Sequence, residues 1–255
     1  MNKVQVVEAQ GTVEPWKGFK DFTVKKKVIE SEEIFTLYLE PTDGGKVVLP
    51  KAGQFIGIKV KSEDEEMKKV IRMYSLSMKP NEDYYRVSIK LVEGGKMTNY
   101  LLNNINEGDI LEVTPPKGLF TLNKEKVDKP LILLGGGIGV TPVLSMLYDV
   151  VGTRDNVHFV YSLRNMKVEC FLKEIKDYRE KGLINANIFF TRPLENEVEG
   201  KDFDRKGRIT KEWIAENLPL DGEFYFCGNK GFTELVQNSL LELGVEKDNI
   251  HFEFF

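Results

Sequence analysis

The hydrophobic pattern of this chain changes near residue 125, and that change restricts the fold more than any other feature. Up to Leu122, short segments alternate apolar and polar residues, as in 86–91, where Val87, Ile89 and Leu91 share one face. Such alternation is typical of half-buried antiparallel strands. We predict strands at residues 22–28, 34–40, 55–61, 73–78, 86–91 and 109–113. Five or six short strands of this kind favour a small closed β-barrel.

Beyond the charged segment 123–130, predicted strands and helices alternate. An apolar strand at 131–134 is followed by a helix that places Val143, Leu144, Leu147 and Val151 on one face. We predict further strands at 157–163, 187–191, 223–227 and 250–255, and further helices at 168–181, 210–218 and 232–243. This order favours a parallel sheet covered by helices. The chain is therefore expected to have two domains, an antiparallel β-barrel (17–124) and an α/β parallel-sheet domain (125–255), after an N-terminal extension (1–16).

Composition and charge exclude several classes of protein. The 255 residues carry a net charge of −4, which gives no basic face for nucleic acid. The two cysteines, Cys170 and Cys227, and the two histidines, His158 and His251, form no closely spaced ligand set, so no metal site is expected. No segment is long and apolar enough for membrane insertion, and residues 1–8 lack the apolar core of a signal peptide. We expect a cytoplasmic protein.

A glycine-rich loop joins the first strand of the second half to its helix. A pyrophosphate needs closely approaching backbone N–H groups and a helix N-terminus, and glycine permits both. Thr141 is expected to cap the helix, with Pro142 in its first turn. The third glycine of the usual dinucleotide fingerprint is missing, so a tight turn without a ligand stays an alternative. The loop consists of Gly137, Ile138, Gly139, Val140, Thr141 and Pro142.

Arg164 follows the second predicted strand of this half. In dinucleotide-binding folds an acidic residue near this point binds the ribose 2′-hydroxyl, whereas an arginine accommodates a 2′-phosphate. Arg192 or Arg208 could add to such a site. An ordinary surface charge is the alternative, because arginines are mostly exposed, so the choice between NADH and NADPH stays open.

In the first half, Arg72, Met73, Tyr74 and Ser75 lie on a predicted barrel strand. There an arginine can pair with a phosphate, a tyrosine can stack on a ring and a hydroxyl can reach a ring nitrogen. Taken alone, these four residues are better explained by an ordinary strand without a ligand. The segment 94–99, Gly-Gly-Lys-Met-Thr-Asn, supplies a second anion-binding turn that leads into a short helix.

Seven motifs in this order resemble the ferredoxin–NADP reductase superfamily, and the chain is most similar to the reductase half of flavohaemoglobins. The resemblance covers about residues 16–255. Its motifs are Gly53 to Phe55, Arg72 to Leu76, Gly94 to Leu101, Pro116 to Phe120, Gly137 to Pro142, Cys227 to Asn229 and His251 to Phe255.

The resemblance implies that FAD, rather than FMN, binds to the barrel, with Tyr74 against the flavin ring, Ser75 near N5 and Glu253 with Phe255 closing over it. The flavin-binding candidates are Phe55, Arg72, Met73, Tyr74, Ser75, Ile89, Lys90, Gly95, Lys96, Met97 and Thr98. It also implies that NADH or NADPH binds to the second half and donates hydride. The candidates there are Gly137 to Pro142, Arg164, Cys227, Gly228, Phe254 and Phe255. Ser75, Cys227 and Glu253 are the candidate catalytic residues, which would orient the rings.

Three residues depart from the family pattern: Phe55 replaces a tyrosine, Asn229 a proline and Phe254 a cysteine. The haem-binding globin half has no counterpart here, so haem ligation is not expected of this chain alone. We therefore expect an NAD(P)H-dependent flavoprotein reductase that passes electrons to a separate haem or iron–sulfur protein. A reductase of free flavin or other small acceptors, and a non-enzymatic nucleotide-binding redox subunit, are the alternatives. The oligomeric state stays open.

Overall fold

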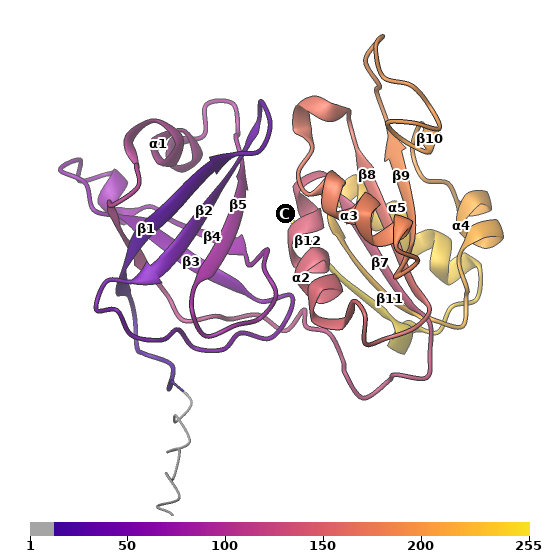
Figure 1. Ribbon diagram of the computed structural model, residues 1–255, viewed down its shortest axis with the longest axis horizontal. Helices are drawn as coiled ribbons and strands as arrows, with labels where there is room; N and C mark the ends of the chain where they lie inside the picture. The colour runs from indigo at the N-terminus through magenta and orange to yellow at the C-terminus, as the bar shows by residue number, and fades with distance from the viewer. Residues whose placement is uncertain (1–12) are drawn as a thin grey trace, which may run out of the picture.

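The computed structural model describes residues 13–255, which form two domains side by side (Figure 1). In the first domain six antiparallel strands form one sheet in the order β4-β3-β6-β1-β2-β5. An antiparallel bridge between Leu76 and Val87 joins the end of β4 to β5 and closes the sheet, which confirms the predicted barrel. The elements are β1 (Lys20–Ile29), β2 (Ile34–Pro41), β3 (Phe55–Val60), β4 (Ile71–Ser75), β5 (Tyr85–Lys90), α1 (Lys96–Asn104) and β6 (Ile110–Val113).

The barrel core follows from the period-two alternation. Val87 and Ile89 of β5 are fully buried, as predicted, and their neighbours on other strands include Phe22, Leu37 and Ile58. Trp16, which we expected in the N-terminal extension, packs on Phe22 and donates its indole N–H to the Val113 carbonyl at 3.0 Å. Residues 1–12 of that extension lie outside the described residues.

The second domain is a parallel sheet of six strands in the order β10-β9-β8-β7-β11-β12. Helices cover both faces, and a buried apolar cluster lies on each side of the sheet. The predicted elements are present with small changes at their ends, but β10 was not predicted because two residues carry no pattern. They are β7 (Leu131–Gly136), α2 (Val140–Val150), β8 (Val157–Leu163), α3 (Leu172–Glu180), β9 (Asn185–Phe190), β10 (Arg205–Lys206), α4 (Lys211–Asn217), β11 (Glu223–Gly228), α5 (Lys230–Glu242) and β12 (Ile250–Phe254).

Helix α2 is buried on nearly every side, whereas the sequence predicted one apolar face. Val143, Leu144 and Leu147 lie in the core as expected, but Ser145 and Met146 are buried as well. The reason is that α2 lies between the sheet and the barrel (Figure 1). The Ser145 hydroxyl donates to the Met78 carbonyl of the barrel at 2.7 Å. One helix therefore contacts both domains.

A second contact between the domains is made by Arg86 of β5, which is buried. Its guanidinium lies 4.6 Å from the centre of the Phe171 ring and 5.4 Å from that of Tyr148, both in the sheet domain. The same guanidinium donates to the Ser77 carbonyl. A buried cation held by aromatic faces and a carbonyl oxygen fixes the orientation of the barrel on the sheet domain.

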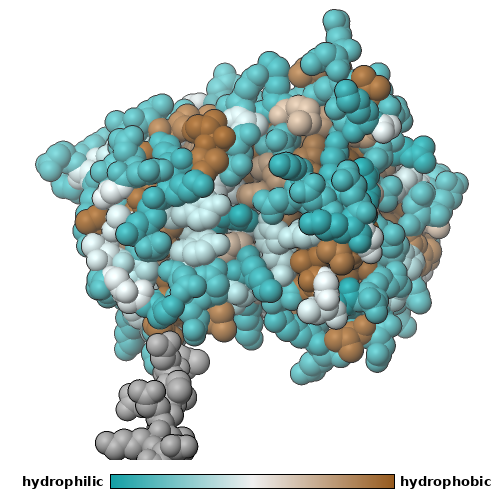
Figure 2. All heavy atoms as spheres, viewed as in Figure 1, coloured by the Kyte–Doolittle hydropathy of each residue, from teal (hydrophilic) through white to brown (hydrophobic). Residues whose placement is uncertain are grey.

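The surface in the view of Figure 2 is mainly hydrophilic, with apolar residues in small separate patches. No helix among residues 13–255 combines the length and the apolar composition that crossing a bilayer requires.

Candidate functional site

The glycine-rich loop lies at the point where the sheet topology switches direction. From β7 the chain proceeds to β8 on one side, and β11 lies on the other. In parallel α/β sheets, ligands bind outside the carboxyl ends of the strands at such a switch point. A 3₁₀ turn (Gly137–Gly139) links the end of β7 directly to α2.

Two glycines of the turn are required for different reasons. A Cβ atom on Gly139 would lie 2.3 Å from the Cys227 carbonyl oxygen, so only glycine allows the turn to contact β11 this closely. Gly137 has a φ of +57°, which other residues rarely adopt, and a Cβ there would meet no atom within 4 Å. The backbone is therefore tightly packed behind the turn and open in front of it, where a ligand phosphate fits.

The expected cap of α2 is wrong. Gly139 occupies the N-cap position without any side-chain hydrogen bond to the helix, and the Thr141 hydroxyl donates back to the Ile138 carbonyl at 2.9 Å. The 3₁₀ turn runs straight into the helix, which places Thr141 inside the first turn together with Pro142. No side chain caps the helix, but the Val140 N–H donates to the Gly137 and Ile138 carbonyls and Pro142 has no N–H. The start of α2 therefore favours an anion mainly through the helix dipole.

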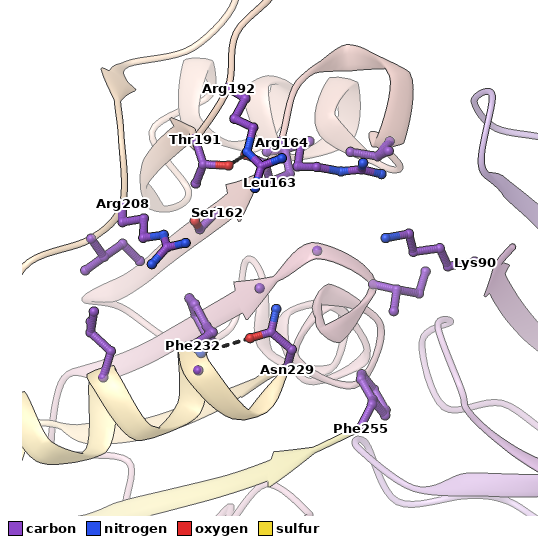
Figure 3. Close-up of a pocket in the computed structure, with 17 residues that line it drawn as sticks. Lys90, Ser162, Leu163, Arg164, Thr191, Arg192, Arg208, Asn229, Phe232 and Phe255 are labelled. Atoms are coloured by element: carbon purple, nitrogen blue, oxygen red, sulfur yellow. Dashed lines mark hydrogen bonds between the residues drawn. The ribbon is translucent and has the colours of Figure 1, made fainter. Parts of the chain in front are cut away.

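A cavity of about 410 Å³ opens in front of this loop, between the strand ends and the barrel (Figure 3). Five residues predicted to bind cofactor line it: Lys90 of the barrel, Gly137, Ile138, Arg164 and Phe255. The sequence analysis missed others, which lie at or just beyond the carboxyl ends of parallel strands. The topological rule for such sheets could have identified them. They include Ser162, Thr191, Asn229 and Phe232.

Three arginines line the cavity: Arg164, Arg192 and Arg208. Within residues 13–255, Arg192 and Arg208 form no ion pair, whereas Arg164 pairs with Glu33 of the barrel. Figure 3 shows Arg164 extending toward the side on which Lys90 lies, away from Arg208. The cavity thus presents two arginines without acidic partners.

The barrel residues Arg72 to Ser75 lie on β4, next to β3, with Phe55 directly opposite Ser75. Arg72 is exposed, and its guanidinium donates to the Ile71 carbonyl at 2.8 Å. The Tyr74 hydroxyl is buried without a hydrogen-bond partner in the described residues, and burial raises its pKa, so it is a neutral phenol. Buried polar atoms normally have partners. A phenol without a partner, near an exposed arginine that has no acidic partner in the described residues, fits a ligand with a polar ring and a phosphate.

Helix α1 supplies a second anion-binding position on the barrel. Gly95 is its N-cap and makes no side-chain cap, so the first N–H groups of this nine-residue helix are open to a phosphate. Lys96 is exposed and pairs with Glu66 at 2.6 Å. The side chains of Met97 and Ile89 are buried in the barrel core, so these two candidates can contact a ligand only through their main chains.

The C-terminal strand and the end of β11 meet beside the glycine turn. Cys227 is fully buried and lies in register with Glu253 of β12. Burial raises the pKa of the Cys227 thiol and of the Glu253 carboxyl above their usual values. Cys227 is therefore a protonated thiol, which does not act as a nucleophile. Phe254 and Phe255 are exposed, and the chain ends between the two domains (Figure 1).

The structure gathers only part of the predicted site in one cavity. Residues on β4 and around the start of α1 do not line it and lie on the barrel. The connection between the two groups is β5, which lies against the Gly137–Gly139 turn and carries Lys90 into the cavity. Of the barrel strands, β5 therefore lies against the candidate nicotinamide-binding loop, and β4 lies beside β5.

Comparisons with known proteins agree with this arrangement. The oxidoreductase FAD-binding domain family matches residues 21–122, and the oxidoreductase NAD-binding domain family matches residues 133–238. A flavohemoprotein from Bacillus cereus is 38% identical over 249 residues, which are 94% of this chain and 61% of that protein. The chain thus spans about three-fifths of the length of the curated relatives it matches.

Two solved structures show the same fold. The flavohaem-like FAD/NAD-binding domain of nitric oxide dioxygenase from Vibrio cholerae matches with a TM-score of 0.83 and 31% identity, covering 92% of this chain and 98% of that domain. A flavohaemoglobin from Malassezia yamatoensis with bound FAD and haem matches with a TM-score of 0.76 and 25% identity, covering 93% of this chain and 60% of that one.

The chain belongs to the family of two-domain oxidoreductases that bind FAD in a barrel and NAD in a parallel-sheet domain. Within this family it corresponds to the reductase part of flavohaemoproteins. It is an NAD(P)H-dependent flavin oxidoreductase, and the open anion-binding positions and the orphaned Tyr74 phenol fit FAD.

Proposed function

We propose that this chain oxidises NADH or NADPH and delivers the electrons to a separate haem or iron–sulfur protein. Bound FAD supplies the connecting chemistry, because it takes a hydride from nicotinamide C4 at its N5 and releases electrons one at a time. One observation carries the proposal: β5 of the barrel lies against the Gly137–Gly139 turn of the sheet domain. Two nucleotide-binding surfaces that meet in this way suit direct transfer between two rings.

On the barrel, we assign Arg72 to a phosphate of FAD and the start of α1, from Gly95 to Thr98, to the pyrophosphate. Tyr74 would contact the ring and Ser75 would lie near N5. Phe55 lies opposite Ser75 on β3. These residues bind and orient. No general acid or base is required, since a hydride carries its own electron pair.

In the sheet domain, the open face of the glycine turn and the N-terminus of α2 bind the nicotinamide pyrophosphate. Cys227 and Glu253 lie side by side at the end of the sheet, and burial favours the neutral form of both groups. At this position the two side chains would contact the nicotinamide and orient it. Phe255, which lines the cavity, shields this region from water.

The proposed acceptor is a separate protein. Among residues 13–255, no group of three or more His, Cys, Asp or Glu side chains could hold a metal ion. The flavohaemoglobin from Malassezia yamatoensis is described with both FAD and haem bound, which supports a haem acceptor for this chain. A cytoplasmic location stays a prediction from the sequence.

The test is an anaerobic titration of the FAD-loaded protein with NADH and with NADPH. We expect the flavin absorbance to bleach, and stopped-flow mixing with a haem or iron–sulfur protein to restore it rapidly. Equally rapid reduction of added free flavin, with no protein acceptor reduced, would favour a reductase of small acceptors. A protein that takes up neither FAD nor FMN, or that is not bleached by either nucleotide, would contradict the proposal.

A further inference from the structure

Glu33, in the turn between β1 and β2 of the barrel, reaches across to the sheet domain. Both of its carboxylate oxygens accept hydrogen bonds from the guanidinium of Arg164. The Lys90 ammonium lies 3.6 Å from the same carboxylate. The turn is fixed beside the end of β5, because the Leu91 N–H donates to the Glu33 carbonyl at 2.7 Å. One carboxylate thus faces two cations from different domains.

Both of these cations line the nucleotide cavity, although Glu33 does not. Arg164 directly follows β8, the position at which an arginine accommodates the 2′-phosphate of NADPH. In the structure its side chain extends toward the barrel, whereas Arg192 and Arg208 lie free in the cavity (Figure 3). Glu33 therefore withholds a cation from the place where a 2′-phosphate would need it.

We propose that Glu33 is a positioning residue that lowers the preference of this protein for NADPH by engaging Arg164. The inference rests on the proposed function, since it concerns the nucleotide that the cavity takes. A 2′-phosphate carries about −1.5 to −2 charges at neutral pH, so it competes with the Glu33 carboxylate for Arg164 and is repelled by it. The neutral 2′-hydroxyl of NADH is nearly indifferent to that carboxylate.

The neighbouring residue supplies a matched control. Glu32 also bridges the domains, pairing with Lys167 at 3.2 Å, but Lys167 does not line the cavity. Glu32→Gln removes one negative charge from the same turn and breaks one interdomain ion pair. It differs from Glu33→Gln in leaving Arg164 and Lys90 paired with Glu33.

The experiment measures the dissociation constants of NAD⁺ and NADP⁺ for the FAD-loaded protein by calorimetry at low salt. Glu33→Gln should tighten NADP⁺ binding by about fivefold, as expected for loss of one partly exposed ion pair. The same variant should change NAD⁺ binding by less than about twofold. Glu32→Gln should leave the ratio of the two constants unchanged. In an Arg164→Gln background, Glu33→Gln should no longer tighten NADP⁺ binding, because the two residues act as a pair.

Equal changes for both nucleotides in Glu33→Gln would show a general effect of domain docking and overturn the inference. So would a tightening that persists in the Arg164→Gln background or that Glu32→Gln reproduces. In each of these cases the wild-type protein still binds a nicotinamide nucleotide, so the proposed function survives. A wild-type protein that binds neither nucleotide would overturn both.

Discussion

The two nucleotide-binding regions of this protein are built in opposite ways. In the sheet domain, the turn Gly137–Gly139 and the start of α2 offer main-chain groups, and Gly139 is packed against the carbonyl of Cys227. In the barrel, the candidate groups are largely side chains on an exposed strand, where Arg72 and Met73 face solvent. The first region depends on the absence of side-chain atoms, and the second depends on their presence.

This difference predicts how each region fails. Added atoms should destroy the sheet-domain site and leave the barrel site intact, because the two lie on separate cores. Removal of a side chain should do the reverse. A pair of variants, one in each region, can therefore separate flavin binding from nicotinamide binding.

The largest effect is expected for Gly139→Val. Its Cβ would lie 2.3 Å from the Cys227 carbonyl oxygen and 2.6 Å from the Gly228 Cα, both in the backbone of a central strand. Since neither can move cheaply, we expect a loss of about 3 kcal/mol in the free energy of unfolding. Nicotinamide binding should be abolished while FAD content is retained, as measured by urea unfolding, NADP⁺ titration and the flavin absorbance of the purified protein.

Gly231→Ala is the control, because a Cβ there would meet only the Asn229 side chain, at an ordinary 3.6 Å. It should keep stability, which is the property it controls for, since Gly231 itself lines the cavity. If Gly139→Val bound NADP⁺ normally, the main-chain site would be misassigned.

The next effect is expected for Arg72→Ala. Loss of a charge-assisted contact to phosphate should weaken FAD binding by about 10- to 100-fold. Stability without FAD should hardly change, because the Arg72 side chain is exposed. Equilibrium dialysis with FAD measures the affinity, and NADP⁺ binding should persist. Lys69→Ala removes the same charge from an exposed position three residues earlier and should retain FAD. Full flavin occupancy in Arg72→Ala would contradict the proposed contact between Arg72 and a phosphate of FAD.

The smallest effect concerns Glu253, whose pKa is raised by burial. An acid with a raised folded-state pKa loses relative stability as pH rises through that value, because its ionised form is poorly solvated. Glu253→Gln should therefore match the wild-type melting temperature near pH 4 and exceed it near pH 7 by about 2 °C or less. Thermal unfolding followed by circular dichroism measures the difference. If the gain in melting temperature of Glu253→Gln over the wild type became smaller as pH rises, the pKa of Glu253 would not be raised in the folded protein.

The same contrast explains what the sequence could predict. The glycine turn and the strand and helix order were predictable, because backbone requirements and periodicity are local. Ile89 and Met97 were assigned to the flavin site, but their side chains complete the barrel core. The Thr141 cap failed because a 3₁₀ turn moved the helix start, which no local pattern indicated.

Contacts between the domains were not predictable from either domain's pattern. The helix α2 has one apolar face in the sequence, yet Ser145 and Met146 are buried because the barrel covers them. Arg86 alternates with apolar core residues like any outward-facing strand residue, and only the folded structure places it against Phe171. Ion pairs such as Arg164 with Glu33 join positions 131 residues apart, so neither sequence neighbourhood indicates the other.

The position of α2 has a consequence for any attempt to recombine this protein with its relatives. A Cβ on Gly53 of the barrel would lie 2.5 Å from the Met146 Cε of this helix, and Ser145 bonds to Met78. A chimera joined within the segment 123–130 would place the α2 helix of another protein against these barrel residues. Exchange of the nicotinamide half should therefore succeed best when the incoming helix keeps serine at position 145 and methionine at position 146, which contact the barrel.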